Sequence, residues 1–133
     1  TMPETVRPHM PDADHVAACT WLDEDALGVY AAEYADVGFQ GGLNWYRARL
    51  DPAAQRGLQL LEGRTIGAAT RFISGQADWG VYQSPGALEA MVERACSRYE
   101  GTVLIEGAGH WVQQERPEAV VDALLDWLRG HGA

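Results

Sequence analysis

The sequence predicts an α/β fold in which a helical segment, residues 1–65, precedes a parallel βαβα unit, residues 66–133. Two short β-prone runs, "TRFISG" and "GTVLIEG", each end at a glycine, as strands commonly do. The stretch between them has apolar residues at helical spacing, and a second amphipathic stretch follows the last run. Strand, helix and strand over this distance form a βαβ unit, whose strands are parallel and whose crossover is right-handed.

The helical segment is expected to begin irregularly, because three prolines interrupt the first 20 residues: Pro3, Pro8 and Pro11. The stretch "LDEDALGVYAAEYADVG" then predicts a helix, since Asp23 is a typical N-cap and Gly38 lies just beyond the helix end. A glycine turn is expected in "FQGGLNWYRARL". Residues 52–62 predict a second short helix with Pro52 at its first position.

The second segment is expected to add two helices to its two strands. The stretch "SPGALEAMVERACSRY" begins with a serine cap and an early proline, and its apolar positions share one helix face: Leu88, Met91, Val92 and Ala95. The stretch "PEAVVDALLDWLRG" predicts the last helix, which stops at Gly130. A stable sheet normally needs about three strands. The two predicted strands therefore leave an open apolar edge, and we expect this edge to pair with another segment or chain.

Composition and charge narrow the range of partners. Apolar residues make up 47% of the chain and the formal net charge is −9, which indicates a globular protein that phosphates of nucleic acid would repel. No apolar run approaches the roughly 18 residues of a membrane helix, and the N-terminus has no signal-peptide core. Cys19 and Cys96 are too few and too far apart for a disulfide framework or a zinc site. We expect a cytoplasmic protein without nucleic acid, membrane, metal ion or cofactor.

Two residues with catalytic chemistry follow the predicted strands. Asp78 lies in "SGQADWG", just past the first strand, and His110 lies in "EGAGHW", just past the second. Functional groups of open α/β sheets collect at the carboxyl ends of the strands, so adjacent parallel strands bring the two loops together. A carboxylate beside an imidazole fixes its tautomer and stabilises the imidazolium, as in a nucleophile–base–acid triad. Alone, Asp78 is more typical of a turn or helix cap, so the pair carries the hypothesis. The remaining histidines are expected to be solvated: His9, His15 and His131.

Three stretches resemble segments of a known family: "LDEDALGVYAAEYADVGFQGGLNWYR", "FISGQADWGVYQSPGALEAM" and "GAGHWVQQERPEAVVDALLDWL". Through them the chain, from about Trp21 onward, resembles the C-terminal half of soluble epoxide hydrolases of the α/β-hydrolase superfamily. The segment "GFQGGLNWYR" is the most specific, since it is typical of epoxide hydrolases and some related dehalogenases. The chain order of acid and then histidine also matches α/β-hydrolases, in which the nucleophile comes first. The resemblance implies a partial α/β-hydrolase fold, with part of a helical lid in residues 1–65 and the C-terminal part of the core in residues 66–133.

The resemblance also implies a mechanism. In this family an aspartate attacks an epoxide carbon and forms an ester, and a histidine oriented by an acid activates water to hydrolyse that ester. Lid tyrosines hydrogen-bond the epoxide oxygen, where negative charge develops. By this resemblance His110 matches the base, Asp78 the orienting acid and Tyr46 a lid tyrosine. Trp45 and Trp111 are expected to line or buttress the substrate pocket, with simple aromatic packing as the alternative.

The chain also departs from the family pattern. No strand-to-helix nucleophile turn precedes residue 20, and the His-Gly oxyanion segment and the other lid tyrosine are not found either. The stretch "IGAATRFISG" has alanines where relatives usually carry a proline before the strand. We therefore expect a chain that begins inside the lid and lacks the N-terminal strands and the nucleophile.

Three hypotheses follow for the function. The first is the C-terminal portion of an epoxide hydrolase, acting on a small-molecule epoxide and inactive without the half that carries the nucleophile. The second is a catalytically dead module that self-associates through its open sheet edge. The third is a fragment of a haloalkane or fluoroacetate dehalogenase or of an esterase relative. The lid tyrosine favours the first over the third, since it has a clear task only when an epoxide oxygen must be polarised.

Overall fold

The structure of the chain, a computed structural model, describes residues 2–131. The chain divides into two compact units, the first ending at Gly38 and the second beginning at Phe39. The boundary that the sequence predicts between residues 65 and 66 falls inside the second unit. As a division between lid segment and core, that boundary stays a prediction.

The first unit is helical. Its elements are α1 (Met2–Val6), the 3-10 turn η1 (Arg7–His9), α2 (Ala13–Ala18) and α3 (Glu24–Val37). The expectation of irregular structure in the first 20 residues is therefore wrong. Pro3 is the second residue of α1 and Pro8 lies in the first turn of η1, where a missing N–H breaks no helical hydrogen bond. Prolines at such positions start helices rather than interrupt them.

Helix α3 is bounded by the two residues that the sequence predicts. The Asp23 carboxylate accepts a hydrogen bond from the Ala26 N–H at 2.8 Å, as an N-cap does. At the other end Gly38 has a φ of 69°, a left-handed conformation that glycine adopts without steric cost. Its N–H donates to the carbonyl oxygen of Tyr34. The predicted helix and both of its boundaries are confirmed.

The second unit begins with two helices, α4 (Gln40–Ala48) and α5 (Pro52–Gln59). The predicted glycine turn is wrong, because Gly41 and Gly42 lie within α4. The positive φ that such a turn requires is found instead at Gly38. Helix α5 begins at Pro52, as predicted, and the Asp51 carboxylate caps it by accepting from the Ala53 N–H at 2.9 Å.

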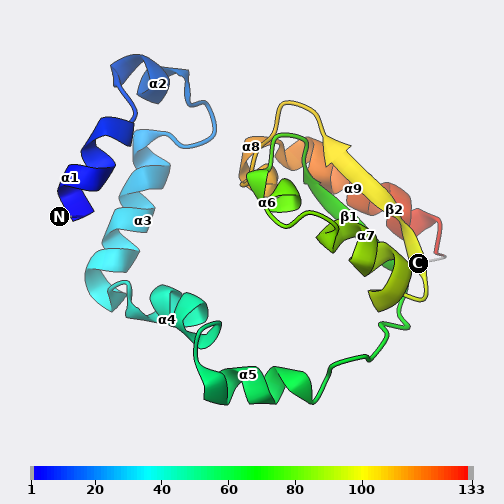
Figure 1. The fold of residues 1–133 in the computed structure, drawn as a ribbon. Coiled ribbons are helices and arrows are strands. Elements are labelled where there is room, and N and C mark those ends of the chain that lie inside the picture. The colour runs from blue at the N-terminus through cyan, green and yellow to red at the C-terminus, as the bar shows by residue number, and fades with distance from the viewer. Residues whose placement is uncertain (1, 132–133) are drawn as a thin grey trace. The chain divides into compact units, whose positions relative to one another are not determined.

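The sheet has two parallel strands within the described residues, β1 (Thr70–Gly75) and β2 (Tyr99–Ile105), which lie side by side in Figure 1. Their register runs from Phe72 opposite Thr102 to Gly75 opposite Ile105. An irregularity between Thr70 and Phe72 shifts the pairing at the start of β1. The predicted parallel pair is confirmed, and the carboxyl ends of both strands meet at one edge.

The crossover between the strands consists of three short helical pieces. These are α6 (Trp79–Tyr82), α7 (Ala87–Ala90) and the π-helical turn η2 (Met91–Ala95). The expected serine cap is not formed: α7 follows Gly86, whose φ is 82°, and no side chain caps it. The Cys96 N–H donates to the Met91 carbonyl at 3.1 Å, the five-residue step that defines a π turn.

After β2 the chain forms α8 (Val112–Glu115) and α9 (Pro117–Arg129), and α9 runs along the strands in Figure 1. A small apolar core joins the end of β2 to these helices: Ile105, Ala108, Val112 and Val120, with Ile73, Val103 and Ala119 packed against it. The predicted last helix is confirmed with its end at Gly130. No helix between residues 2 and 131 combines the length and apolar character needed to cross a membrane.

His131 departs from the expectation that it is solvated. Its side chain is 33% exposed, its Nδ1 lies 2.7 Å from the Trp127 carbonyl oxygen, and its Nε2 lies 2.5 Å from Glu100 Oε2. Trp127 Nε1 donates to the same carboxylate oxygen at 2.6 Å. The sequence hides this cluster because β2 supplies Glu100, while Trp127 lies in α9 and His131 just beyond its end.

Candidate active site

The loops after β1 and β2 are held together through their backbones. The Gln76 N–H donates to the Ile105 carbonyl at 2.9 Å, and the Ala77 N–H donates to the Ala108 carbonyl at 3.0 Å. A Cβ added at Gly75 would lie 2.4 Å from the Ala108 carbonyl oxygen, a distance that real Cβ atoms do not show. Glycine at the end of β1 therefore allows the second loop to cross directly over the strand end.

Asp78 is the centre of the hydrogen bonds in these loops. It is buried, with 8% of its surface exposed. Its Oδ1 accepts from the Gly80 N–H at 2.7 Å, which caps α6, and lies 2.8 Å from His110 Nδ1. Its Oδ2 accepts from the Ser74 hydroxyl at 2.9 Å. Asp78 therefore caps a helix and also contacts His110, as its two interpretations from the sequence predict.

The charge of Asp78 fixes the proton on His110. Burial raises the pKa of Asp78, but the hydrogen bonds from His110, Gly80 and Ser74 together outweigh burial and hold the pKa below its ordinary value. Asp78 is consequently ionised at neutral pH and accepts hydrogen bonds only. The neutral His110 ring must then donate from Nδ1, and its Nε2 carries the lone pair that can accept a proton.

His110 lies between two indole rings. Its ring is stacked on Trp79, with ring centroids 5.0 Å apart and an interplanar angle of 25°. Trp111 meets the ring edge-on at 5.3 Å and 73°. The imidazole side chain remains 43% exposed, so the indoles orient the ring and leave part of it accessible. Trp111 thus buttresses His110; whether it also lines a substrate pocket stays a prediction.

Glu115 belongs to this site, although the sequence did not single it out. Its Oε2 accepts from the Gly109 N–H at 2.7 Å and its Oε1 accepts from the Trp111 N–H at 2.9 Å. The carboxylate therefore binds the N–H groups of the two residues that flank His110. The available signal was a carboxylate about one helical turn after a loop N–H, a pattern related to the capping box.

The residues expected from the lid lie on α4. Tyr46 and Trp45 are 65% and 73% exposed, respectively. No hydrogen bond of the described residues joins Tyr46 to Asp78 or His110, so the structure joins Asp78 to His110 but not to Tyr46. The lid role of Tyr46 stays a prediction.

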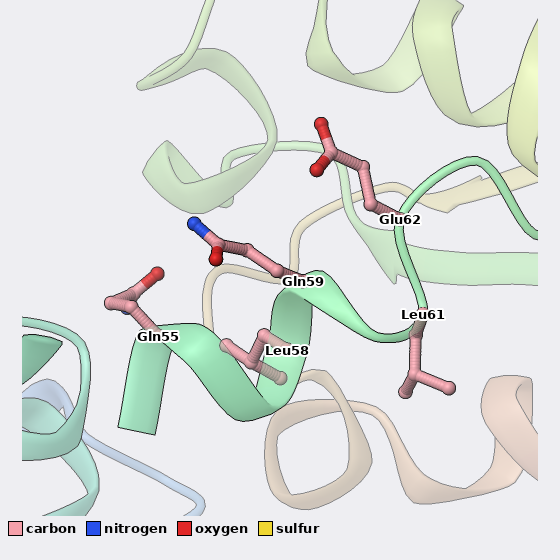
Figure 2. Close-up of a pocket in the computed structure, with 5 residues that line it drawn as sticks. All are labelled: Gln55, Leu58, Gln59, Leu61 and Glu62. Carbon is pink, nitrogen blue, oxygen red and sulfur yellow. The ribbon is translucent and has the colours of Figure 1, made fainter. Parts of the chain in front are cut away.

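Two hollows lie along α4 and α5. One, of about 410 Å³, is lined mainly by apolar groups, and Trp45 is among them: Trp45, Ala48, Arg49, Ala54 and Leu58. The other, of about 370 Å³, lies against α5 and the turn after it, as Figure 2 shows: Gln55, Leu58, Gln59, Leu61 and Glu62. The first hollow is consistent with Trp45 as a pocket residue, which stays a prediction. Residues 2–131 contain no group of three His, Cys, Asp or Glu side chains arranged to hold a metal ion.

Comparisons with known proteins agree on one family. No protein-family profile matches the chain. The chain is 41% identical over 113 residues to epoxide hydrolase A of Mycobacterium tuberculosis, which covers 83% of the chain and 33% of that protein. It superposes on epoxide hydrolase I of potato with a TM-score of 0.77 and 34% identity, over 91% of the chain and 38% of the potato protein. Epoxide hydrolase A of Mycobacterium thermoresistibile gives a TM-score of 0.67 and 42% identity, over 84% of the chain and 34% of that structure.

The chain thus spans about a third of the length of the curated relatives it matches. The matched part carries the parallel strand pair and the loops that follow it, with Asp78 and His110. By sequence and by fold, the chain matches the C-terminal part of epoxide hydrolases of the α/β-hydrolase superfamily.

Proposed function

We propose that this chain supplies the base and the orienting acid of an epoxide hydrolase, an enzyme that adds water to an epoxide through an aspartyl ester. The observation that carries the proposal is the 2.8 Å contact between His110 Nδ1 and Asp78 Oδ1 at the carboxyl ends of two parallel strands. That contact leaves Nε2, the other ring nitrogen of the partly exposed His110, free to act as a base. The names of the relatives supply the substrate class.

The first step of the proposed reaction uses a carboxylate from outside the 133 residues of this sequence. One carboxylate oxygen bonds to an epoxide carbon while the bond between that carbon and the ring oxygen breaks. The ring oxygen takes both electrons of the broken bond and gains a proton from a lid tyrosine. Tyr46 is the proposed donor in this chain, and its resemblance to the family motif supports that role.

The second step belongs to His110. A water oxygen attacks the carbonyl carbon of the ester, and His110 Nε2 takes one proton from this water. The carbon–oxygen bond to the alkoxide then breaks, and the alkoxide takes the proton held by His110 and leaves as the diol. The carboxylic acid that remains returns its proton to the tyrosinate, which regenerates both the carboxylate and the tyrosine. Asp78 stabilises the transient imidazolium, since its carboxylate stays ionised. The sum is epoxide plus water to vicinal diol, with no cofactor.

The chain alone is proposed to be inactive, because neither His110 nor Asp78 is placed to form the ester. The proposed partner is the segment that carries the nucleophile, or a second copy of the chain, pairing with the open edge of the two-stranded sheet. The cytoplasm is the proposed location. A dead self-associating module and a dehalogenase or esterase relative remain the alternatives, and the epoxide hydrolase names of the relatives favour the enzyme.

The test is His110→Gln in the complete protein that carries this sequence, mixed with styrene oxide and examined by denaturing mass spectrometry. Ester formation needs no base, so the variant is expected to accumulate protein with one added styrene oxide, while diol release falls by about 10³-fold or more. His9→Gln makes the same change at an exposed histidine of the first unit and is expected to behave as the parent protein. Normal diol release by His110→Gln would exclude His110 as the base.

A further inference from the structure

We infer that Glu115 is a positioning residue that holds His110 in place against Asp78. Its carboxylate accepts hydrogen bonds from the N–H groups of the two residues that flank the histidine, at 2.7 Å from Gly109 and 2.9 Å from Trp111. A catalytic consequence of this arrangement rests on the proposed function of His110, whereas the positioning itself does not.

These two hydrogen bonds to the Glu115 carboxylate, called the clamp below, are needed because of how the loop is anchored. Ala108 and Val112 are in the apolar core, with 1% and 5% of their surfaces exposed. Between them the chain leaves the core, and the His110 side chain is 43% exposed. Core packing therefore fixes Ala108 and Val112, at the two ends of this short loop. It does not fix the backbone between them, which sets the direction of the imidazole.

Glu115 can fix this part of the loop because its own position is set by α8. Its own N–H donates to the Trp111 carbonyl at 2.8 Å, and the next N–H, of Arg116, donates to the Val112 carbonyl at 2.9 Å. The carboxylate lies directly over Gly109, since a Cβ added there would meet Glu115 Oε1 at 3.3 Å. The loop and α8 thus stabilise each other through Glu115, and His110 lies between the two loop residues that Glu115 contacts.

Two acceptor oxygens are required by this geometry. Each carboxylate oxygen receives one N–H, and an ionised carboxylate can serve both because it accepts hydrogen bonds only. A glutamine amide in the same place could accept from one N–H but would direct its NH₂ donor at the other. Glu115→Gln therefore changes the clamp while leaving the side-chain size nearly unchanged, and it is the test variant.

The first experiment needs no reaction. In the complete protein, amide hydrogen exchange and the downfield proton resonance of His110 Nδ1–H are measured by NMR. Both the Gly109 and Trp111 amides are expected to be protected in the parent protein although they lie in a partly exposed loop. In Glu115→Gln, exchange at Gly109 or Trp111 is expected to accelerate at least about 10-fold, and the His110 resonance to broaden or disappear.

The second experiment separates positioning from simple loss of structure by following the two chemical steps with styrene oxide. Ester formation is expected to stay within about twofold in Glu115→Gln, while ester hydrolysis slows about 10-fold or more, because only the second step uses His110. Glu106→Gln removes a carboxylate from an exposed position of the same loop and should leave both steps and both amides unchanged.

The outcomes decide the two proposals separately. Equal slowing of both steps, or an unchanged His110 resonance with fast loop amides, would overturn the positioning role. A parent protein that forms no ester would overturn the proposed function, and the NMR measurements would still decide the role of Glu115. If Glu115→Gln does not fold, Glu115→Asp keeps the charge but shortens its reach, and it must show the same selective loss. Unprotected Gly109 and Trp111 amides in the parent protein would overturn the inference without any variant.

Discussion

The α-carbon of Gly75 faces the backbone of Gly109 so closely that a Cβ added at residue 75 would lie 2.1 Å from the Gly109 carbonyl oxygen. Gly75 ends β1, and Gly109 immediately precedes the candidate base. The contact between the two strand-end loops therefore depends on the absence of one methyl group. It also explains how residues separated by a whole crossover reach hydrogen-bonding distance.

Replacement of Gly75 by alanine is expected to force the loops apart. The obstacle is backbone rather than a flexible side chain, so overpacking of about 1–3 kcal/mol or more is expected. Thermal unfolding should show a lower Tm, and NMR should show the loss of the His110–Asp78 hydrogen bond. Gly67→Ala is the matched control, because a Cβ at Gly67 meets nothing within 4 Å. Equal Tm values for the two variants would contradict the close contact.

Ser74→Ala is expected to raise the pKa of Asp78 towards its ordinary value. The Ser74 hydroxyl is buried and donates to Asp78 Oδ2, so its removal leaves burial less well opposed. The expected loss of stability is about 1–3 kcal/mol, since a buried charged acceptor loses a partner. A pH titration of the Asp78 carboxyl carbon by NMR measures the pKa. Ser97→Ala, which removes an exposed hydroxyl bond of 3.3 Å, should leave it unchanged.

Asp78→Asn tests the tautomer of His110. The amide can donate to the ring as well as accept from it, so the proton is no longer confined to Nδ1 and Nε2 is no longer reliably free. In the complete protein, ester hydrolysis is expected to fall by roughly 10⁴-fold, the scale found when the acid of a triad becomes an amide. The measurement is single-turnover diol release from a preformed ester. A loss below about tenfold would show that Asp78 does not set the proton position.

The cluster at the end of α9 predicts that stability falls as the pH rises and His131 loses its proton. The Trp127 carbonyl oxygen and the Glu100 carboxylate both raise the pKa of His131, whereas partial burial opposes them. Because the pKa in the folded state exceeds the unfolded value of about 6.5, the stabilisation is fully present below that pH. It is lost as the pH rises through the raised pKa.

This pH dependence can be measured by thermal unfolding of the parent protein and of His131→Gln between about pH 5.5 and 9. The lower limit avoids protonation of Glu100, whose pKa the His131 and Trp127 hydrogen bonds hold below its usual value. The Tm advantage of the parent protein should be largest at the acid end and shrink towards the alkaline end. A constant difference would show that the ion pair does not link α9 to β2.

The strand pair and the contact between Asp78 and His110 could be predicted, because both follow from local sequence patterns and the geometry of parallel strands. "TRFISG" is β1 to the residue, and parallel strands must bring Asp78 and His110 to the same edge. The first helices could not be predicted from proline content, since the effect of Pro3 and Pro8 depends on whether they start or interrupt a helix. Glu115 was missed for a different reason. Its partners are backbone N–H groups, which every sequence contains, so only the turn of α8 reveals the link.

The close approach at Gly75 has a consequence for how the chain assembles. If β1 slipped by one residue against β2, Ser74 or Gln76 would face the Ala108–Gly109 backbone, and their Cβ atoms would collide with it. The contact at the strand end therefore disfavours a pairing that is shifted by one residue in either direction. We therefore expect the contact between Asp78 and His110 to form only in the register observed here, in which the two strand-end loops meet.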